Sequence, residues 1–174
     1  VRQQYTNQAV GYFKRYLANE KKPSPDILMF YASLIYNQAV EDPAKLNTAL
    51  LQQAADELQT ALYSAIHPKE QIYVLLLAIL QQQNNIPRSA EILEYIVQEN
   101  PTKKDYWLAL SQTYLALAGE KDLAPDKVRQ FYIRSINTYE RAQALGFMST
   151  PKDNLYLVNL YLLVGQFSKG TQML

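Results

Sequence analysis

The amino-acid sequence predicts an all-α protein, and three observations support that prediction. All eight prolines lie between segments of helical apolar periodicity or in their first turns, where the missing N–H of proline costs little. Three of the five glycines, Gly119, Gly146 and Gly165, stand where periodic segments stop, which is the usual position of glycine after a helix. No segment alternates apolar and polar residues between hairpin turns, as a strand would.

Nine helices are expected, joined by connections short enough that consecutive helices pack antiparallel. Ser24 and Thr150 are the predicted N-caps of two of them, because each precedes a proline and an acid follows within the first turn. Asn84 and Asn85 are expected in a turn that needs a left-handed conformation, which asparagine tolerates better than most residues. The predicted helical segments are 3–19, 25–40, 44–65, 69–83, 87–99, 103–118, 125–145, 152–163 and 167–174.

Length and charge restrict the class of protein. The 174 residues suffice for one domain with a continuous core. The 17 basic and 16 acidic side chains nearly cancel, whereas a nucleic-acid binder normally gathers a basic excess on one face, so we expect no nucleic-acid partner. Lys14, Arg15, Lys21 and Lys22 form the densest basic group, and near a helix C-terminus such charges complement the helix dipole.

Cysteine is absent, which excludes disulfides, thiol nucleophiles and thiolate metal sites. This absence fits an oxidising compartment, so a periplasmic location is favoured over a cytoplasmic one, although small cytosolic domains also lack cysteine. No apolar run reaches the roughly 18 residues that a membrane span needs, so direct membrane insertion is not expected. The chain begins at Val1 without a signal-peptide pattern, which indicates a piece of a longer protein.

A helical motif sets the register of the whole chain. Trp107, Leu110, Ser111 and Tyr114 follow the spacing i, i+3, i+4 and i+7, which places them on one face of a helix. The small Ser111 lets a second helix approach closely. Together with Pro101 before Trp107, this pattern resembles the first-helix signature of a tetratricopeptide repeat, with serine where the family prefers glycine. We interpret Trp107 as a packing residue between helices.

The resemblance continues in phase along the chain and implies a single α-α superhelix, a tetratricopeptide-like solenoid, over residues 1–174. The implied division is a truncated repeat's second helix at 1–22, repeats at 25–68, 70–103 and 104–149, and an incomplete repeat at 151–174. The alternative fold is an ordinary helical bundle with an aromatic core.

Tyrosine is abundant, with 14 copies, and many copies fall at frame positions where a ring fills the gap between helices. Those predicted to lie in the core are Tyr36, Tyr73, Tyr114, Tyr139 and Tyr161. Partial exposure is expected for Tyr31, Tyr106 and Tyr156.

A second resemblance concerns residues 100–104, 139–142 and 159–161. These segments look like the corresponding parts of bacterial periplasmic repeat proteins that are encoded with TonB-type energy-transducing systems. The insertion after Gly119 departs from that pattern. The resemblance implies a setting in the bacterial envelope.

Residue types that carry chemistry are few. The one histidine, His67, has no second ligand or base in reach of a sequence argument, so we interpret it as solvated in a turn. The acids Glu41 and Asp42 are interpreted as solvated in a connection, and Asp56 and Glu57 as the wet face of a helix. No phosphate loop, serine elbow or metal-ligand cluster is present. The sequence predicts neither an enzyme nor a cofactor.

Binding surfaces follow from the first resemblance. In tetratricopeptide superhelices the first helix of each repeat lines a concave groove, and here the corresponding positions carry apolar side chains and amides. Amides bind the backbone of an extended peptide, and apolar neighbours hold its side chains. Family members that clamp a C-terminal carboxylate carry lysine where this chain is apolar, so that clamp is not expected. The candidate groove residues are Phe30, Leu34, Asn37, Val74, Gln81, Leu108, Gln112, Leu155 and Asn159.

We therefore expect a non-enzymatic scaffold or adaptor that binds a protein partner, as a peptide or a helix, in a concave groove. The alternative is a regulatory or scaffold region of a larger protein whose activity lies outside this sequence. Two further alternatives stay open: helices of the same protein fill the groove, or the chain is a single-strand RNA-binding repeat. The sequence leaves the partner's identity and the oligomeric state undefined.

Overall fold

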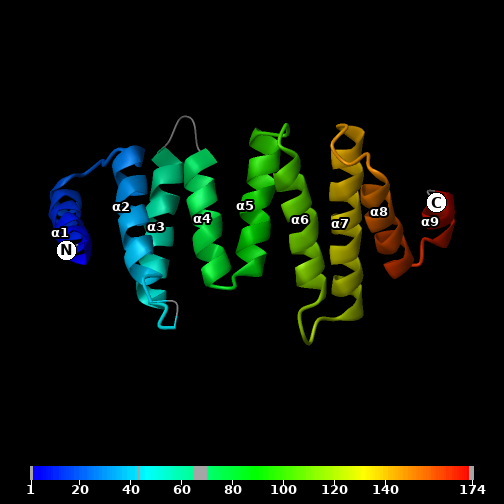
Figure 1. The fold of residues 1–174 in the computed structure, drawn as a ribbon, viewed down its shortest axis with the longest axis horizontal. Coiled ribbons are helices and arrows are strands. Elements are labelled where there is room, and N and C mark those ends of the chain that lie inside the picture. The colour runs from blue at the N-terminus through cyan, green and yellow to red at the C-terminus, as the bar shows by residue number, and fades with distance from the viewer. Residues whose placement is uncertain (1, 43, 65–69, 173–174) are drawn as a thin grey trace. The chain divides into compact units, whose positions relative to one another are not determined.

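The structure is a computed structural model that describes residues 2–42, 44–64 and 70–172. As predicted, these residues form helices and connections, with no strand in the described ranges. They group into two compact units, Val1–Asn85 and Ile86–Leu174. Each helix packs on the next within its unit, and the direction alternates from α1 to α4 and from α5 to α8 (Figure 1).

The first unit contains four helices, α1 (Arg2–Asn19), α2 (Pro25–Ala39), α3 (Thr48–Ser64) and α4 (Glu70–Gln82). Helix α3 packs on α2 and on α4, α1 packs on α2, and α2 also contacts α4. Ala54 and Ala61 of α3 are fully buried, and small side chains of this kind allow a neighbouring helix to approach closely. The large fully buried core residues of this unit include Leu28, Ile35, Leu51, Leu58 and Ile79.

The second unit contains five helices, α5 (Ile86–Glu99), α6 (Lys104–Ala118), α7 (Pro125–Ala144), α8 (Pro151–Leu163) and α9 (Phe167–Gln172). Each of these helices packs on the next, and α6 and α7 form the most extensive pair. The pairs α2 with α3 and α6 with α7 lie within the segments 25–68 and 104–149, and the division of the chain into repeats stays a prediction. The repeat predicted at 70–103 takes α4 from one unit and α5 from the other, so its pairing stays a prediction.

The predicted helix boundaries agree with the structure within one residue, apart from the start of α3. The predicted helical residues 65, 69, 173 and 174 lie outside the described ranges. Helix α3 begins at Thr48 because Asn47 caps it: the Asn47 side chain accepts a hydrogen bond from the Leu50 N–H at 3.1 Å. In the connection between α2 and α3, the Asp42 side chain accepts a hydrogen bond from the Ala44 N–H at 3.0 Å. This contact is typical of a turn, whereas the sequence predicted the start of a helix there.

Both predicted N-caps are confirmed. The Ser24 hydroxyl accepts a hydrogen bond from the Ile27 N–H at 3.4 Å. Thr150 forms a capping box with Asp153, in which each side chain accepts a hydrogen bond from the backbone N–H of the other. Of the two asparagines expected in a turn, Asn84 has the left-handed conformation, with φ of 52°, whereas Asn85 does not.

The face predicted around Trp107 is buried between helices. Trp107 is 4% exposed, and its indole N–H donates a hydrogen bond to the Pro101 carbonyl at 2.9 Å. Ser111 on α6 and Ser135 on α7 are completely buried, and their hydroxyl oxygens lie 2.8 Å apart. Ser135 also donates to the Ser111 carbonyl at 2.9 Å, so the small residue does permit the close approach that was predicted.

Most tyrosine predictions are confirmed, and those for Tyr36 and Tyr31 are not. Every predicted core tyrosine is buried except Tyr36, which is half-buried. Tyr31 was expected to be partly exposed, yet it is 1% exposed. Its hydroxyl accepts a hydrogen bond from Gln53 of α3 at 3.1 Å, and the Phe13 ring of α1 lies 6.0 Å from its ring. Side chains from α1 and α3 therefore cover Tyr31.

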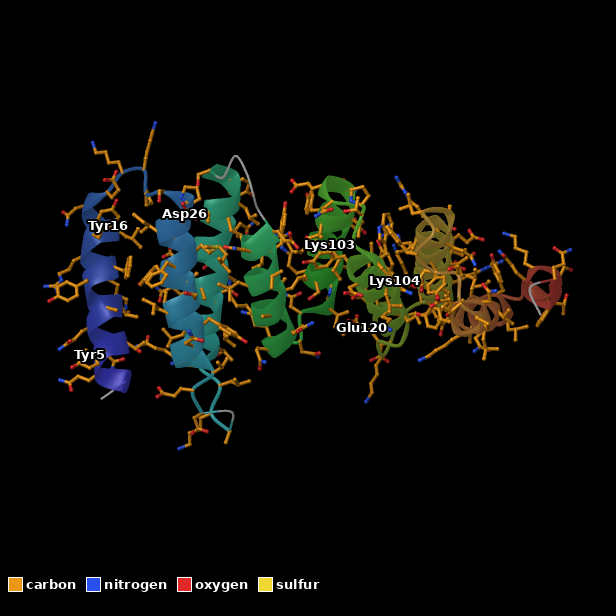
Figure 2. The ribbon with its side chains drawn as sticks, turned by 45° about the horizontal axis from the view of Figure 1, so that its top comes forward. Tyr5, Tyr16, Asp26, Lys103, Lys104 and Glu120 are labelled. Atoms are coloured by element: carbon orange, nitrogen blue, oxygen red, sulfur yellow. The ribbon has the colours of Figure 1, made fainter. Side chains whose placement is uncertain are left out.

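Outside the core, Tyr106 and Tyr156 are half-buried, as expected. Tyr16 on α1, labelled in Figure 2, is largely exposed. Within the described residues, no helix combines the length and the apolar character that a membrane crossing requires.

The burial of Trp107 leads to a stability prediction. Trp107→Ala is expected to lower the free energy of unfolding by about 3–5 kcal/mol, because it removes a buried ring and leaves a cavity. Urea unfolding followed by circular dichroism measures this loss. Tyr95→Ala is the control, since Tyr95 is an exposed aromatic residue on α5 of the same unit, and its loss should stay within about 0.5 kcal/mol. Equal losses in the two variants would contradict the packing role of Trp107.

Candidate binding surfaces

The candidate groove residues of the first unit lie on α2 and α4, which contact each other. Phe30 is 54% exposed and Val74 is 49% exposed. Asn37 and Gln81 are exposed, whereas Leu34 is half-buried. The Phe30 ring also packs against Phe13 of α1, with 5.5 Å between ring centroids. The first unit therefore presents apolar side chains beside amides, as the sequence suggested.

The candidates of the second unit lie on α6 and α8. Leu155 is 53% exposed and Asn159 is exposed, and Leu162, which was not among the candidates, is 44% exposed on the same helix. These three residues follow the spacing i, i+4 and i+7 and share one side of the helix, which we call the α8 face. On α6, Gln112 is exposed and Leu108 is half-buried.

The candidate residues thus form two sets, one in each unit. Their membership of a single continuous groove stays a prediction. Within each unit the pattern is the same: an apolar residue begins the exposed side of the helix, and an amide follows one or two turns later. This pattern suits contact with a partner that offers both apolar side chains and backbone groups.

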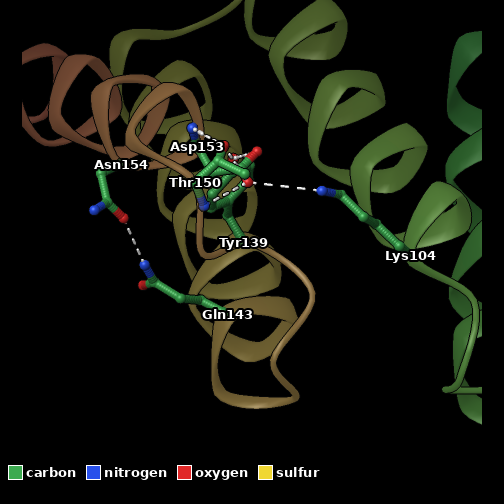
Figure 3. Close-up of polar contacts among 6 residues, drawn as sticks. All are labelled: Lys104, Tyr139, Gln143, Thr150, Asp153 and Asn154. Carbon is green, nitrogen blue, oxygen red and sulfur yellow. Dashed lines mark hydrogen bonds and ion pairs between the residues drawn. The ribbon is translucent and has the colours of Figure 1, made fainter.

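Asp153 anchors the start of α8 to two other helices (Figure 3). Besides the capping box with Thr150, its carboxylate accepts a hydrogen bond from the Tyr139 hydroxyl of α7 at 3.1 Å. The ammonium group of Lys104, at the start of α6 (Figure 2), lies 3.6 Å from the same carboxylate. One carboxylate therefore joins α6, α7 and α8 at one end of the α8 face.

The neighbours of Asp153 set its electrostatic state. Burial alone would raise the pKa of this carboxyl, but hydrogen bonds from the Thr150 hydroxyl and backbone N–H oppose that effect. The Tyr139 hydroxyl and the positive charge of Lys104 act in the same direction as Thr150. The net result is a pKa below the usual 3.8, so the charged carboxylate is favoured in the folded protein.

A three-residue polar contact, not anticipated from the sequence, joins α5, α6 and α7. The hydroxyl of Tyr114 on α6 donates a hydrogen bond to the carboxylate of Glu94 on α5. The guanidinium of Arg134 on α7 lies 5.8 Å from the centroid of the Tyr114 ring and 3.9 Å from Glu94. An acid, a tyrosine and a cation from three consecutive helices therefore meet at one point.

The same contact recurs one repeat later. Tyr161 on α8 donates a hydrogen bond to Glu140 on α7. Lys169 on α9 lies 5.3 Å from the centroid of the Tyr161 ring and 3.6 Å from Glu140. The two contacts occupy equivalent places. Arg134 directly precedes Ser135 and Lys169 directly precedes Gly170, and these two small residues are the first buried residues of α7 and α9.

These contacts perturb both tyrosines. Burial and, next, the hydrogen bond to a carboxylate raise the pKa of Tyr114 and that of Tyr161 above the usual 10. The positive charge of Arg134 partly offsets this effect by lowering the pKa of Tyr114. The hydroxyls thus stay protonated and act as donors. The recurrence of acid, tyrosine and cation at fixed frame positions was the sequence signal that could have revealed these contacts.

The remaining polar predictions concern the other acids and the histidine. Glu41 and Asp42 are exposed, as expected, and Asp56 is exposed beside the half-buried Glu57. Burial and the neighbouring charge of Asp56 raise the pKa of Glu57. His67 lies outside the described residues. No group of three or more histidines, cysteines or acids suited to a metal ion occurs within the described ranges.

Comparison with known proteins supports the fold. No protein-family model matches the chain, and no curated protein matches it. Among solved structures, a human IFIT1 dimer with PPP-AAAA superposes with a TM-score of 0.50 at 16% sequence identity, over 97% of this chain. A human IFIT1 dimer with m7Gppp-AAAA gives a TM-score of 0.49 at 16% identity, again over 97% of this chain. The chain spans 45% of the IFIT1 chain, somewhat less than half its length.

The likeness to IFIT1 shows a tetratricopeptide-like helical-repeat fold. It offers no support for the resemblance to proteins of TonB-type systems, and the compartment stays a prediction. One expectation is overturned: the prediction excluded a nucleic-acid partner, yet IFIT1, which shares this fold, is solved with PPP-AAAA. Net charge describes the entire surface, whereas binding depends on the charges near one site, so a near-neutral total does not exclude such a partner.

The anchor at Asp153 predicts acid sensitivity. Because its pKa is lowered in the folded protein, its stabilisation is present above pH 3.8 and is lost as the pH falls below that value. Asp153→Asn is therefore expected to be less stable than the wild type by about 1 kcal/mol near neutral pH. The difference should shrink as the pH approaches about 2.

Urea unfolding at several pH values measures this effect. Asp126→Asn serves as the control, because Asp126 is an exposed acid in the first turn of α7. A constant difference between the wild type and Asp153→Asn across the acid range would count against the anchoring role of the charged carboxylate.

The tyrosine contacts predict alkaline sensitivity. The pKa values of Tyr114 and Tyr161 are raised in the folded protein, so their stabilisation is complete below pH 10 and decreases as the pH rises above it. In the variant with both Tyr114→Phe and Tyr161→Phe, the free energy of unfolding should fall less steeply between about pH 9 and pH 11. Tyr95→Phe, at an exposed site, should keep the wild-type slope. An unchanged slope in the double variant would refute the prediction.

Proposed function

We propose that the chain is a non-enzymatic helical-repeat binding module whose α8 face binds an apolar, weakly charged peptide or helix. The observation that carries the proposal is the exposure of Leu155 and Leu162 on a helix whose other side is fully committed to the core. Two exposed leucines separated by two helical turns form an apolar strip rather than a single surface residue.

Asn159 supplies the polar part of the α8 face. Its amide both donates and accepts hydrogen bonds, so it suits the backbone of an extended peptide or the end of a helix. The apolar side chains on either side exclude water from that contact. No charged residue lies between Leu155 and Leu162, so this face offers no ion pair to a partner. It therefore favours a peptide of low charge, bound through its neutral backbone and its apolar side chains.

The α8 face is also held rigidly. Asp153 ties the first turn of α8 to α6 and α7, and Tyr161 ties its last turn to α7 and α9. A surface fixed at both ends loses little conformational entropy when a partner binds. The exposed Phe30 and Val74 give the first unit a surface of the same character, which supports binding through more than one repeat.

Panning a phage-displayed library of random peptides against the chain tests the proposal. We expect enriched peptides to be rich in apolar residues and poor in charge. Binding of these peptides should fall by at least about tenfold in the variant with both Leu155→Glu and Leu162→Glu, because two charges then line the apolar strip. Both positions are exposed, so the variant should keep the circular dichroism spectrum of the wild type.

Tyr95→Glu is the matched control, since Tyr95 is exposed to a similar degree on α5 and lies outside the α8 face. It should bind the enriched peptides as the wild type does. Equal binding by the α8-face variant and the wild type would refute the proposal. Selective binding of a single-stranded oligo(A) RNA, with an affinity that falls steeply as salt is added, would identify a nucleic-acid-binding repeat instead.

A further inference from the structure

An open cleft of about 430 Å³ lies in the second unit, away from the candidate groove residues. One wall comes from the connection between α6 and α7 and from the first turns of α7, through Leu123, Val128, Arg129 and Tyr132. The opposite wall is the end of α8, where Leu163 and Val164 line the cleft. This volume is within the range of small-ligand sites.

The insertion after Gly119 creates this cleft. Helix α7 has 20 residues and the antiparallel α8 has 13, so the start of α7 extends past the end of α8 by about 10 Å. The first turns of α7 therefore have no turns of α8 beside them. Leu123, in the connection between α6 and α7, also lines the cleft. The feature that departs from the repeat pattern is thus the feature that forms a site.

The lining combines apolar walls with one positive charge. Leu123, Val128 and Leu163 contribute aliphatic side chains, and Arg129 is the only charged residue of the lining. Arg129 and Tyr132 are spaced i and i+3 on α7, so they share one side of the helix. Within the described part of the chain, Arg129 forms no ion pair. Its guanidinium is therefore available to an anionic group.

We propose that this cleft binds the free C-terminus of a polypeptide whose last residues are apolar. A terminal carboxylate and the last side chain are attached to the same carbon atom, so a ligand of this kind places an anion next to an apolar group. Arg129 would bind the carboxylate through two parallel hydrogen bonds, and the Tyr132 hydroxyl would donate a third. The aliphatic walls from Leu123, Val128 and Leu163 would enclose the last side chain.

This site differs from the carboxylate clamp that the sequence argued against. That clamp requires lysine on the first helices of the repeats, whereas Arg129 and Tyr132 lie on the second helix of a repeat and next to an insertion. The site is also independent of the α8 face, because Leu155 and Asn159 do not line the cleft.

Fluorescence anisotropy with a short labelled peptide ending in Leu-Leu tests this proposal. The free-acid peptide is expected to bind at least about tenfold more tightly than the same peptide with an amidated C-terminus. Arg129→Ala should reduce binding of the free acid to the level of the amide and leave binding of the amide unchanged. Leu163→Asp should weaken binding of both peptides.

Lys127→Ala is the matched control, because it removes one exposed positive charge from the same helical turn without altering the cleft lining. It should bind the free acid as the wild type does. The variant with Leu155→Glu and Leu162→Glu should also keep this binding, which separates the proposal from that for the α8 face.

Three results would overturn the proposal. The first is equal binding of the acid and the amide, or full binding by Arg129→Ala. The second is no binding of the free acid up to about 1 mM, which corresponds to less than about 4 kcal/mol of binding free energy. The third is tight binding of dodecanoic acid, tested in parallel, without binding of the peptide, which would indicate an acyl-chain carboxylate as the ligand.

Discussion

The contact between Ser111 and Ser135 is the constraint on which the second unit depends. Two fully buried serines let α6 and α7 approach closely, and their hydroxyls bond to each other and to the Ser111 carbonyl. The pairing leaves no buried donor without an acceptor, which removes the main cost of placing polar groups in a core. The close approach fixes the register of the two helices. Trp107 is then buried above this contact, with Arg141 of α7 5.6 Å from the centre of its ring.

The same register positions the tyrosines that join one repeat to the next. Tyr114 lies one turn after Ser111, so it reaches back to α5 and forward to α7 at once. Tyr161 repeats this geometry between α7 and α9. Partly exposed ion pairs of this kind contribute little stability individually. Their effect is to orient each helix relative to two neighbours, and through α8 they determine which residues face outward.

Two kinds of surface result from this arrangement. The α8 face presents leucines and an amide without charge, whereas the cleft beside α7 presents one guanidinium among aliphatic side chains. A chain whose charges nearly cancel in total thus carries local sites of distinct chemistry. Binding depends on the groups within a few ångströms of a ligand, because exposed charges farther away are screened by salt. Whole-chain charge was therefore a poor guide to the class of partner.

Local sequence signals were sufficient for the helices, for the caps at Ser24 and Thr150, and for the inner face around Trp107, because each depends on residues within a turn or two of one another. The exposed Leu155 of α8 was among the groove positions that the resemblance to tetratricopeptide repeats implied. The burial of Tyr31 was not predicted, because it depends on side chains from α1 and α3. The hydrogen bonds from tyrosine to acid in the acid–tyrosine–cation contacts join residues 20 or 21 positions apart, and the cleft lies between α7 and α8, which differ in length. Only packed helices bring such distant groups together, so the tertiary structure decided which polar residues meet and where a ligand can enter.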